Sequence, residues 1–273
     1  MSGKLYVVGT PIGNLEDMSP RAVRVLDEAD FIAAEDTRVT VKLLNHFGIK
    51  KEMLSYYEHN KNSKGNLIIE RILNGESCAL VSDAGMPAIS DPGEDLVRQA
   101  HEVGICVESV PGPSALVTAL SISGMESGRF CFEGFLSVNK ISRKEHLEEV
   151  KNESRTMIFY EAPHKLPATL RDMLAVFGDR KIALVKELTK IHETVNGTTL
   201  SAAAEYYSEN TPKGEFVLII EGKRRENTEQ YSLEDAVKLA KRLIKEGKST
   251  SSAAKEAAEV SGLKKSSIYK ELI

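Results

Sequence analysis

Residues 78–110 read CALVSDAGMPAISDPGEDLVRQAHEVGICVESV, and this stretch decides the class of fold. It opens with a continuous apolar run at 78–83, which is typical of a strand buried on both faces of a sheet. A helical pattern follows, with Asp91 and Pro92 as its start signal and Gly104 at its end. A second apolar run, at 105–110, predicts another strand. A strand, a helix and a strand within about thirty residues indicate a right-handed parallel crossover.

The same alternation extends along most of the chain. Further apolar runs predict strands at residues 5–9, 31–36, 155–163, 181–190 and 214–222. The later runs lie closer together in the sequence, which predicts a mixed sheet with antiparallel pairs. From Ser232 onward the patterns are helical only, and a break near Gly262 between two small helices suggests a helix-turn-helix shape.

These patterns predict an α/β protein in three parts. Residues 1–135 are expected to form an N-terminal α/β domain with a parallel sheet. Residues 136–222 are expected to form a second α/β domain with a mixed sheet, because the polar segment 136–145 has no strong periodicity and suits a boundary. Residues 223–273 are expected to form a small helical extension.

Composition and charge narrow the classes of function. The chain has 41% hydrophobic and 28% charged residues, which supports a real core and excludes wholesale disorder. Trp is absent, which argues against a broad platform for stacking bases. The net charge of −4 does not favour tight non-specific nucleic-acid binding. Residues 223–273, however, carry a net charge of +4, which hints at a polyanionic partner or a solvated helical face.

The cysteines and the amino-terminal sequence indicate the cellular compartment of the protein. Cys78, Cys106 and Cys131 form no closely spaced pair, which argues against disulfides and zinc and for a reducing compartment. The sequence starts without a basic-then-apolar leader, and no apolar run approaches the roughly 18 residues of a membrane span. We therefore expect a cytoplasmic protein with no membrane association.

Several well-known motifs are absent from the sequence. The loop GTPIGN at 9–14 matches neither GxGxxG nor the P-loop pattern, which argues against a dinucleotide oxidoreductase and a P-loop NTPase. The six His residues show no metal-ligand spacing, so no metal site is predicted. GxSxG does not occur, which argues against a hydrolase elbow.

Polar loops follow the predicted strands instead. SDAGMPAISDPG (82–93) places a carboxylate, a glycine and a proline directly after a strand, and VPGPSA (110–115) places Ser114 at a helix start. Similar loops in the second half are YEAPHK (160–165), KELTKIHE (186–193) and KGEF (213–216). In parallel sheets, ligands bind off the carboxyl ends of the strands. Ligand-binding loops in both halves predict a cleft between two α/β domains.

Eight segments, taken in their order along the chain, form a pattern that is more specific than any single glycine-rich loop. They are GTPIGNLEDMSPRA (9–22), AAEDTR (33–38), LVSDAGMPAISDPG (80–93), VPGPSA (110–115), RFCFEGFL (129–136), FYEAPHK (159–165), KELTK (186–190) and KGEFVLI (213–219). Together they resemble the ribosomal RNA small subunit methyltransferase I family, a branch of the tetrapyrrole (corrin/porphyrin) methylase superfamily. The resemblance runs from about residue 4 to 222, and the helical tail looks like the C-terminal extension of that family.

The resemblance implies a two-domain tetrapyrrole methylase-like (class III) α/β fold with a C-terminal helical extension. It implies a homodimer that binds S-adenosylmethionine (SAM) in the interdomain cleft. The implied reaction is methylation of the ribose 2′-hydroxyl of a cytidine in the decoding region of 16S ribosomal RNA, free or in the small subunit. The cofactor contacts carried over by motif are Pro11, Asp83, Ala84, Gly85, Pro87, Ser114, Ala115, Ala162, Leu188, Gly214 and Glu215.

Two positions depart from the family pattern. Met86 stands where Thr is usual, and it either removes a hydrogen bond near SAM or points away. Lys186 stands where Arg is common and cannot make the bidentate contact of a guanidinium.

The implied chemistry needs alignment of the reacting atoms and removal of the hydroxyl proton. Alignment contributes about 7–11 kcal/mol, and proton removal contributes roughly 10²–10⁴ in rate. The candidate bases are Glu35, Asp36 and His59, chosen because they follow strands. The candidate phosphate contacts are Arg38, Lys165 and Lys190, together with the basic segment 223–273.

Two alternatives stay open from the sequence. One is another activity of the same superfamily, methylating a tetrapyrrole or a protein side chain. The other is a DNA-binding regulator that reads DNA with its last helix, but Lys264, Lys265 and Lys270 there are not joined by Arg, Asn or Gln for bidentate base contacts.

Overall fold

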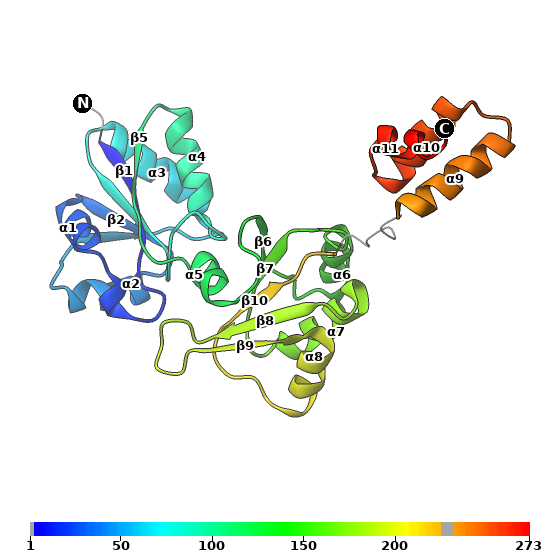
Figure 1. Cartoon of the computed structure of the whole chain (residues 1–273). Helices are drawn as coiled ribbons and strands as arrows, with labels where there is room; N and C mark the ends of the chain where they lie inside the picture. Colours follow the sequence, from blue (N-terminus) through cyan, green and yellow to red (C-terminus); the bar gives the residue numbers. More distant parts are fainter. Residues whose placement is uncertain (1–2, 225–231) are drawn as a thin grey trace. The chain divides into compact units, whose positions relative to one another are not determined.

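A computed structural model describes residues 3–224 and 232–273. The chain divides into two compact units, one ending at Lys223 and the other running from Arg224 to Ile273. The larger unit contains two sheets, and the smaller is helical (Figure 1). Among the described residues, no helix is both long enough and apolar enough to cross a membrane.

The first sheet is entirely parallel, as predicted. Its five strands follow the order β3-β2-β4-β1-β5. Their bounds are β1 (Lys4–Val8), β2 (Phe31–Ala34), β3 (Glu52–Ser55), β4 (Cys78–Val81) and β5 (Cys106–Val110). The sequence analysis did not predict β3, because this edge strand is only partly buried and lacks a continuous apolar run. The carboxyl ends of all five strands meet at one edge, where ligands bind in such sheets.

Helices cover both faces of this sheet. They are α1 (Pro20–Glu28), α2 (Thr37–His46), α3 (Lys61–Leu73) and α4 (Gly93–Glu102), and the short 3₁₀ helix η1 (Leu15–Asp17) precedes α1. Helix α5 (Ala115–Ile122) follows β5. In β2, Ile32 belongs to the core on one face and Phe31 to the core on the other. Burial on both faces explains why the central strands are continuously apolar.

Local signals explain two helix starts. Ser19 accepts a hydrogen bond from the Ala22 N–H, and Pro20 occupies the first turn of α1. We expected α4 to start at Asp91 and Pro92. It starts at Gly93, and the Asp91 carboxylate accepts the Gly93 N–H at 2.8 Å.

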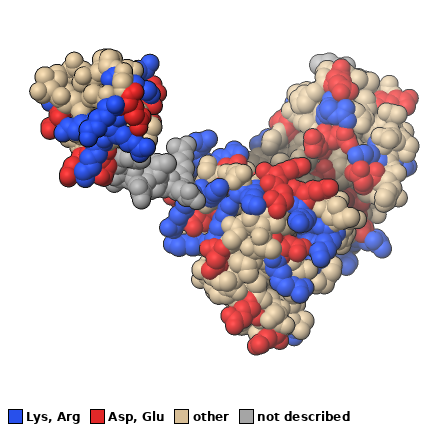
Figure 2. Space-filling model, turned by 90° about the vertical axis from the view of Figure 1, so that its right-hand side faces the viewer, with Lys and Arg blue, Asp and Glu red and all other residues tan. Residues whose placement is uncertain are grey.

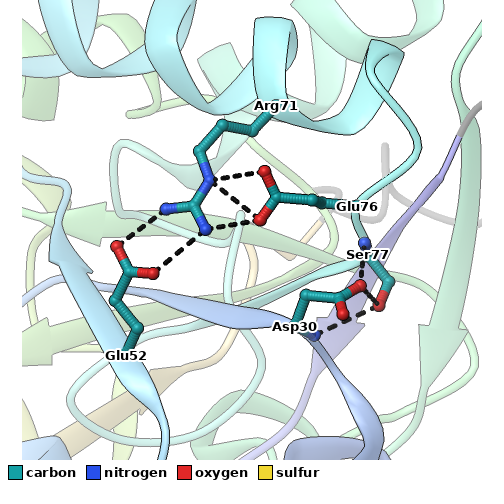
Figure 3. A network of polar contacts seen from close by, with 5 residues as sticks. All are labelled: Asp30, Glu52, Arg71, Glu76 and Ser77. Atoms are coloured by element: carbon teal, nitrogen blue, oxygen red, sulfur yellow. Dashed lines mark hydrogen bonds and ion pairs between the residues drawn. The ribbon is translucent and has the colours of Figure 1, made fainter.

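A charged network ties the amino ends of β2, β3 and β4 together (Figure 3). Arg71, on α3, donates to both oxygens of Glu52 on β3 and of Glu76 in the loop before β4. The Arg71 guanidinium also lies 3.8 Å from the centre of the Phe31 ring. Asp30, beside Phe31, accepts hydrogen bonds from the backbone N–H and the hydroxyl of Ser77. This network holds the edge of the sheet opposite the strand ends that carry the polar loops.

The second sheet is mixed, as predicted, with the order β6-β7-β10-β8-β9. The bounds are β6 (Phe130–Phe135), β7 (Thr156–Glu161), β8 (Lys181–Lys186), β9 (Thr194–Thr199) and β10 (Phe216–Ile220). Strands β6 and β7 are parallel, and the other pairs are antiparallel. The helices around this sheet are α6 (Lys140–Glu149), α7 (Leu166–Phe177) and α8 (Leu200–Glu209).

The structure moves the expected boundary at residue 135. Strand β6 already belongs to the second sheet, so the second half begins before residue 135. The polar segment 136–145, expected to hold the domain boundary, contains the start of α6, whose only buried residue is Leu147. A helix with one buried position has almost no apolar periodicity, which is why the pattern missed it.

Helix α5 joins the two halves. It follows β5 of the first sheet, and its Ala119 and Leu120 pack in a core with Ile158 of β7 and Val217 of β10. The other face of the second sheet packs on α7 and α8. Because α5 belongs to the first half by sequence and to the second by packing, it fixes the carboxyl edge of the first sheet beside the second sheet (Figure 1).

The smaller unit contains α9 (Leu233–Lys245), α10 (Thr250–Ser261) and α11 (Lys265–Lys270) around a small alanine-rich core. Ser232 caps α9, and Gly262 ends α10 in the left-handed conformation. The predicted break near Gly262 is therefore confirmed.

Candidate active site

A cavity of about 510 Å³ lies where the carboxyl edge of the first sheet faces the second sheet. Its wall is drawn from loops far apart in the sequence. The lining residues are Ile12, Glu35, Ser82, Asp83, Ala84, Gly85, Met86, Ile89, Ser90, Asp91, Ser114, Ala115, Phe135, Tyr160, Glu161, Ala162, Pro163, Val185, Leu188, Glu215, Phe216 and Val217. In the space-filling view, Asp and Glu side chains gather near the hollowed middle of the larger unit (Figure 2).

Most of the residues carried over for the cofactor lie in this wall. Those that line the cavity are Asp83, Ala84, Gly85, Ser114, Ala115, Ala162, Leu188 and Glu215, together with the candidate base Glu35. The predicted site residues that do not line it are Pro11, Pro87, Gly214, Asp36, His59, Arg38, Lys165 and Lys190. The lining residues Glu161 and Asp91 were not proposed from the sequence. Glu161 is the last residue of β7, and Asp91 lies two residues before α4.

The loops after β1 and β4 are tied by a short backbone bridge. The Thr10 N–H donates to the Gly85 carbonyl at 2.9 Å, and the Gly85 N–H donates to the Thr10 carbonyl at 3.1 Å. Gly85 has a φ of +84°, a conformation that a side chain disfavours. The bridge holds residues 83–85 against the end of β1.

The loops after β1 and β5 meet backbone to backbone. A Cβ atom on Gly9 would lie 2.6 Å from the Cα of Gly112, so only glycine allows this approach. Ser114, the N-cap residue of α5, lies two residues further along the chain. The floor of the cavity is thus built from three loops in direct backbone contact.

Glu35 and Asp83 form the acidic corner of the cavity. The Asp83 N–H lies 3.4 Å from Oε2 of Glu35, and Oδ1 of Asp83 accepts the Asp36 N–H at 3.0 Å. Burial raises the pKa of Glu35, and the negative charge of Asp83 raises it further. Burial also raises the pKa of Asp83. A half-buried carboxylate, Glu35, and a more exposed one, Asp83, therefore share one corner of the wall.

Asp36 does not line the cavity, and its side chain has a structural role. Its Oδ1 accepts the Arg38 N–H at 2.8 Å and caps α2. The Arg38 guanidinium donates to both Asp36 oxygens and lowers the pKa of Asp36 to about 2. A carboxylate held this firmly in its ionised form is a weak proton acceptor. The Arg38 side chain, although paired with Asp36, is 88% exposed.

The segment 56–60 lies after β3 and contains His59. Asn60 shapes it by accepting the Tyr57 N–H and donating to the Ser55 carbonyl. His59 is exposed, with its ring 6.3 Å from the Tyr57 ring. Tyr56 is buried and its hydroxyl lacks a hydrogen-bond partner among the described residues, and burial raises the pKa of that hydroxyl to about 12. His59 thus belongs to an exposed turn outside the cavity wall.

The second sheet supplies a wall with its own polar ties. The buried carboxylate of Glu161 accepts the Ala162 N–H at 2.8 Å and the Thr169 hydroxyl at 2.5 Å. Lys165 is the residue before α7. These bonds fix the turn that carries Ala162.

A second tie joins the segments 187–190 and 214–215. Glu187 accepts the Glu215 N–H at 3.0 Å. The Lys190 ammonium donates to Glu187 at 3.1 Å and to Glu215 at 2.9 Å. Lys190, expected to contact phosphate, is therefore already paired with two carboxylates. Its stem also packs over Gly13, which links this segment to the loop after β1.

The fold and cavity together define a class of protein. The family model described as Tetrapyrrole (Corrin/Porphyrin) Methylases matches residues 4–204, and the chain belongs to this family. Solved structures with the same fold include uroporphyrin-III-C-methyltransferase from Thermus thermophilus, with a TM-score of 0.57 and 20% identity over 81% of this chain and 94% of that chain. Diphthine synthase matches with a TM-score of 0.62 and 15% identity, over 81% of this chain and 90% of that chain.

Curated relatives narrow the class to one group, whose members are named ribosomal RNA small subunit methyltransferase I. The protein from Haemophilus influenzae is 46% identical over 98% of this chain and 96% of its own length. The protein from Xylella fastidiosa is 47% identical over 98% of both. The protein from Halalkalibacterium halodurans is 53% identical over 81% of this chain and 76% of its own length. At this similarity the chain belongs to the same group, and it is a methyltransferase.

Proposed function

We propose that this chain is a SAM-dependent ribosomal RNA methyltransferase that acts on the ribose 2′-hydroxyl of a cytidine in the decoding region of 16S ribosomal RNA. The names of the curated relatives support the class of substrate. The observation that carries the proposal is a cavity bordered by loops from both sheets, since most of the cofactor positions suggested by motif line it.

The lining residues suit SAM in shape and charge. Small residues dominate one side, where Ala84, Gly85 and Ala115 leave room for a ligand of this size. The carboxylates of Glu35 and Asp83 suit a cation. SAM supplies a methyl group on a positively charged sulfur. Residues 83–85, 114–115 and 162, with Leu188 and Glu215, would hold it.

Glu35 is the candidate base that the geometry favours. It lines the cavity, whereas Asp36 is paired with Arg38 and His59 lies in an exposed turn. A carboxyl group whose pKa is raised by burial accepts a proton better than an ordinary one. Asp36 would act by position, because its N–H holds Asp83 and its side chain starts α2.

Phosphate contacts would come from cations outside the cavity wall. Arg38 is held at the start of α2 with its guanidinium exposed, and Lys165, which is half-buried, lies directly before α7. In the helical unit, Lys264 and Lys270 have no carboxylate partner among the described residues. Lys and Arg side chains also gather on the visible face of that unit (Figure 2). The helical unit would thus add electrostatic affinity for RNA.

We also propose that the enzyme works as a cytoplasmic homodimer. Phe135, Val138 and Ile141, which lie close together in the sequence, are 56%, 73% and 70% exposed, and exposed apolar side chains suit an interface. Light scattering coupled to size-exclusion chromatography tests this, with twice the monomer mass expected.

Two measurements test the activity. Calorimetry of the purified chain should detect SAM binding, and Gly85→Val, which fills the floor, should abolish it. Mass mapping of 16S ribosomal RNA from cells lacking the gene should find one unmethylated cytidine ribose. The intact gene should restore the methyl group and the variant should not. Methyl transfer to a tetrapyrrole or a protein, with RNA untouched, would overturn the proposed substrate.

A further inference from the structure

The cavity wall is acidic to an unusual degree. Among the described residues that line it, five are Asp or Glu and none is Lys, Arg or His. The acidic members are Glu35, Asp83, Asp91, Glu161 and Glu215. A wall of this kind disfavours nucleotides that carry phosphate groups and favours a cationic ligand.

Three of these carboxylates already have partners. Asp91 accepts the backbone N–H groups of Ala88, Ile89 and Gly93. Glu161 accepts from Ala162 and Thr169, and Glu215 pairs with Lys190. Their charges are therefore largely satisfied inside the protein.

Glu35 and Asp83 differ from these three. Among the described residues, Glu35 has one donor, the Asp83 N–H, at the long distance of 3.4 Å. Asp83 uses Oδ1 for the Asp36 N–H, and its Oδ2 has no donor within that part of the chain. Two like charges thus face the same cavity. The cation that acts on Asp83 is Arg38, which is paired with Asp36 and does not line the wall. The repulsion between the two carboxylates is therefore relieved further when a positive charge enters the cavity.

We infer that Glu35 and Asp83 make this cavity selective for the sulfonium charge of its ligand, so that SAM binds more tightly than S-adenosylhomocysteine, the product whose sulfur is neutral. This rests on the proposed function, because it names how that same site treats its cofactor.

The reaction itself removes the charge that the corner recognises. The ribose oxygen forms a bond to the methyl carbon, the C–S bond breaks, and its electron pair stays on sulfur. The hydroxyl proton leaves to a base. Sulfur is then neutral, and the attraction to Glu35 and Asp83 is lost. The acidic corner would therefore favour release of the product over retention.

Calorimetry with three ligands tests the inference on the full chain. All three ligands share the ammonium and carboxylate of the amino-acid part. SAM and sinefungin, whose ammonium group replaces the sulfonium methyl, carry one further positive charge at the reacting centre, and S-adenosylhomocysteine does not. Wild type should bind the two cations more tightly. Glu35→Gln, which keeps the shape, should weaken SAM and sinefungin binding about tenfold and change S-adenosylhomocysteine binding about twofold or less.

Controls separate the inference from the proposed function. Glu28→Gln removes one charge outside the cavity wall and should change none of the three affinities. Asp83→Asn tests the second member of the corner in the same way. If all three ligands lose affinity equally in Glu35→Gln, or if wild type binds them equally, charge selection is wrong. If wild type binds none of the three, the proposed cofactor is wrong.

Discussion

The backbone N–H of Asp36 donates to the carboxylate of Asp83 at 3.0 Å, across a gap of 47 residues in the sequence. This bond joins the loop after β2 to the loop after β4. In the opposite direction, the backbone N–H of Asp83 lies 3.4 Å from the carboxylate of Glu35, the residue before Asp36. These contacts hold the two loops together. The position of the Asp83 carboxylate at the cavity therefore depends on the backbone of Asp36.

Substitutions of Asp83 should separate its charge from its hydrogen bond. Asp83→Asn keeps an oxygen that accepts the Asp36 N–H, whereas Asp83→Ala removes it. We expect Asp83→Ala to lower kcat/KM about tenfold more than Asp83→Asn, because a displaced loop misaligns the reacting groups. Steady-state kinetics on ribosomal RNA measures this. Equal losses in the two variants would show that the hydrogen bond does not matter.

Glu35 and Asp36 should differ in their pH–rate profiles. Glu35→Gln should lower the single-turnover rate roughly 10²–10⁴-fold and remove the acid limb of the profile, as expected for a base. Asp36→Asn should slow the reaction about tenfold or less and keep the acid limb, because its pKa of about 2 excludes it from proton transfer near neutral pH. A retained acid limb in Glu35→Gln would assign the base elsewhere.

SAM affinity should decrease as the pH is lowered. Burial raises the pKa of Glu35 and of Asp83 in the free protein, with added repulsion from Asp91 and Asp36 on Glu35 and an opposing attraction of Arg38 on Asp83. A bound cation favours their ionised forms. SAM affinity should therefore fall as the pH drops through the raised pKa values and level off above them. Calorimetry from pH 5 to 8 checks this, and the dependence should shrink in Glu35→Gln.

Gly9→Ala should damage both stability and binding. The added Cβ would meet the Gly112 backbone at 2.6 Å, so the loops after β1 and β5 must separate. We expect the free energy of unfolding to fall by about 1–3 kcal/mol, together with a loss of SAM affinity. Gly128→Ala is a matched control, since nothing lies within 4 Å of its Cβ position. Urea denaturation should find the control close to wild type.

Arg71→Met should destabilise the first sheet without touching the cavity. The guanidinium forms ion pairs with Glu52 and Glu76 (Figure 3) and lies over the Phe31 ring. Its loss therefore leaves two carboxylates unpaired. We expect a loss of about 1–3 kcal/mol in the free energy of unfolding, less than for a fully buried pair because the site is partly exposed. SAM affinity of the folded variant should equal that of wild type. A changed affinity would reveal coupling between the two edges of the sheet.

Local patterns were sufficient for much of this protein. The continuous apolar runs around residues 78–110 predicted a parallel sheet, and the polar loops after them predicted the edge where the cavity lies. The spacing of the later runs predicted the mixed sheet, and Gly262 marked the last turn. These features depend on the period of burial and on backbone preference, which neighbouring residues set among themselves.

The tertiary structure decided which side chains remain available. Asp36 was a candidate base and Lys190 a candidate phosphate contact, both by position in the sequence. In the structure, Arg38 is paired with Asp36. Lys190 is paired with two carboxylates, Glu187 and Glu215. The edge strand β3 and the exposed helix α6 escaped the sequence analysis, because neither buries enough apolar surface to leave a period. Ion pairs and cavity walls join residues tens of positions apart. Packing alone brings such residues together, so no local pattern in the sequence encodes them.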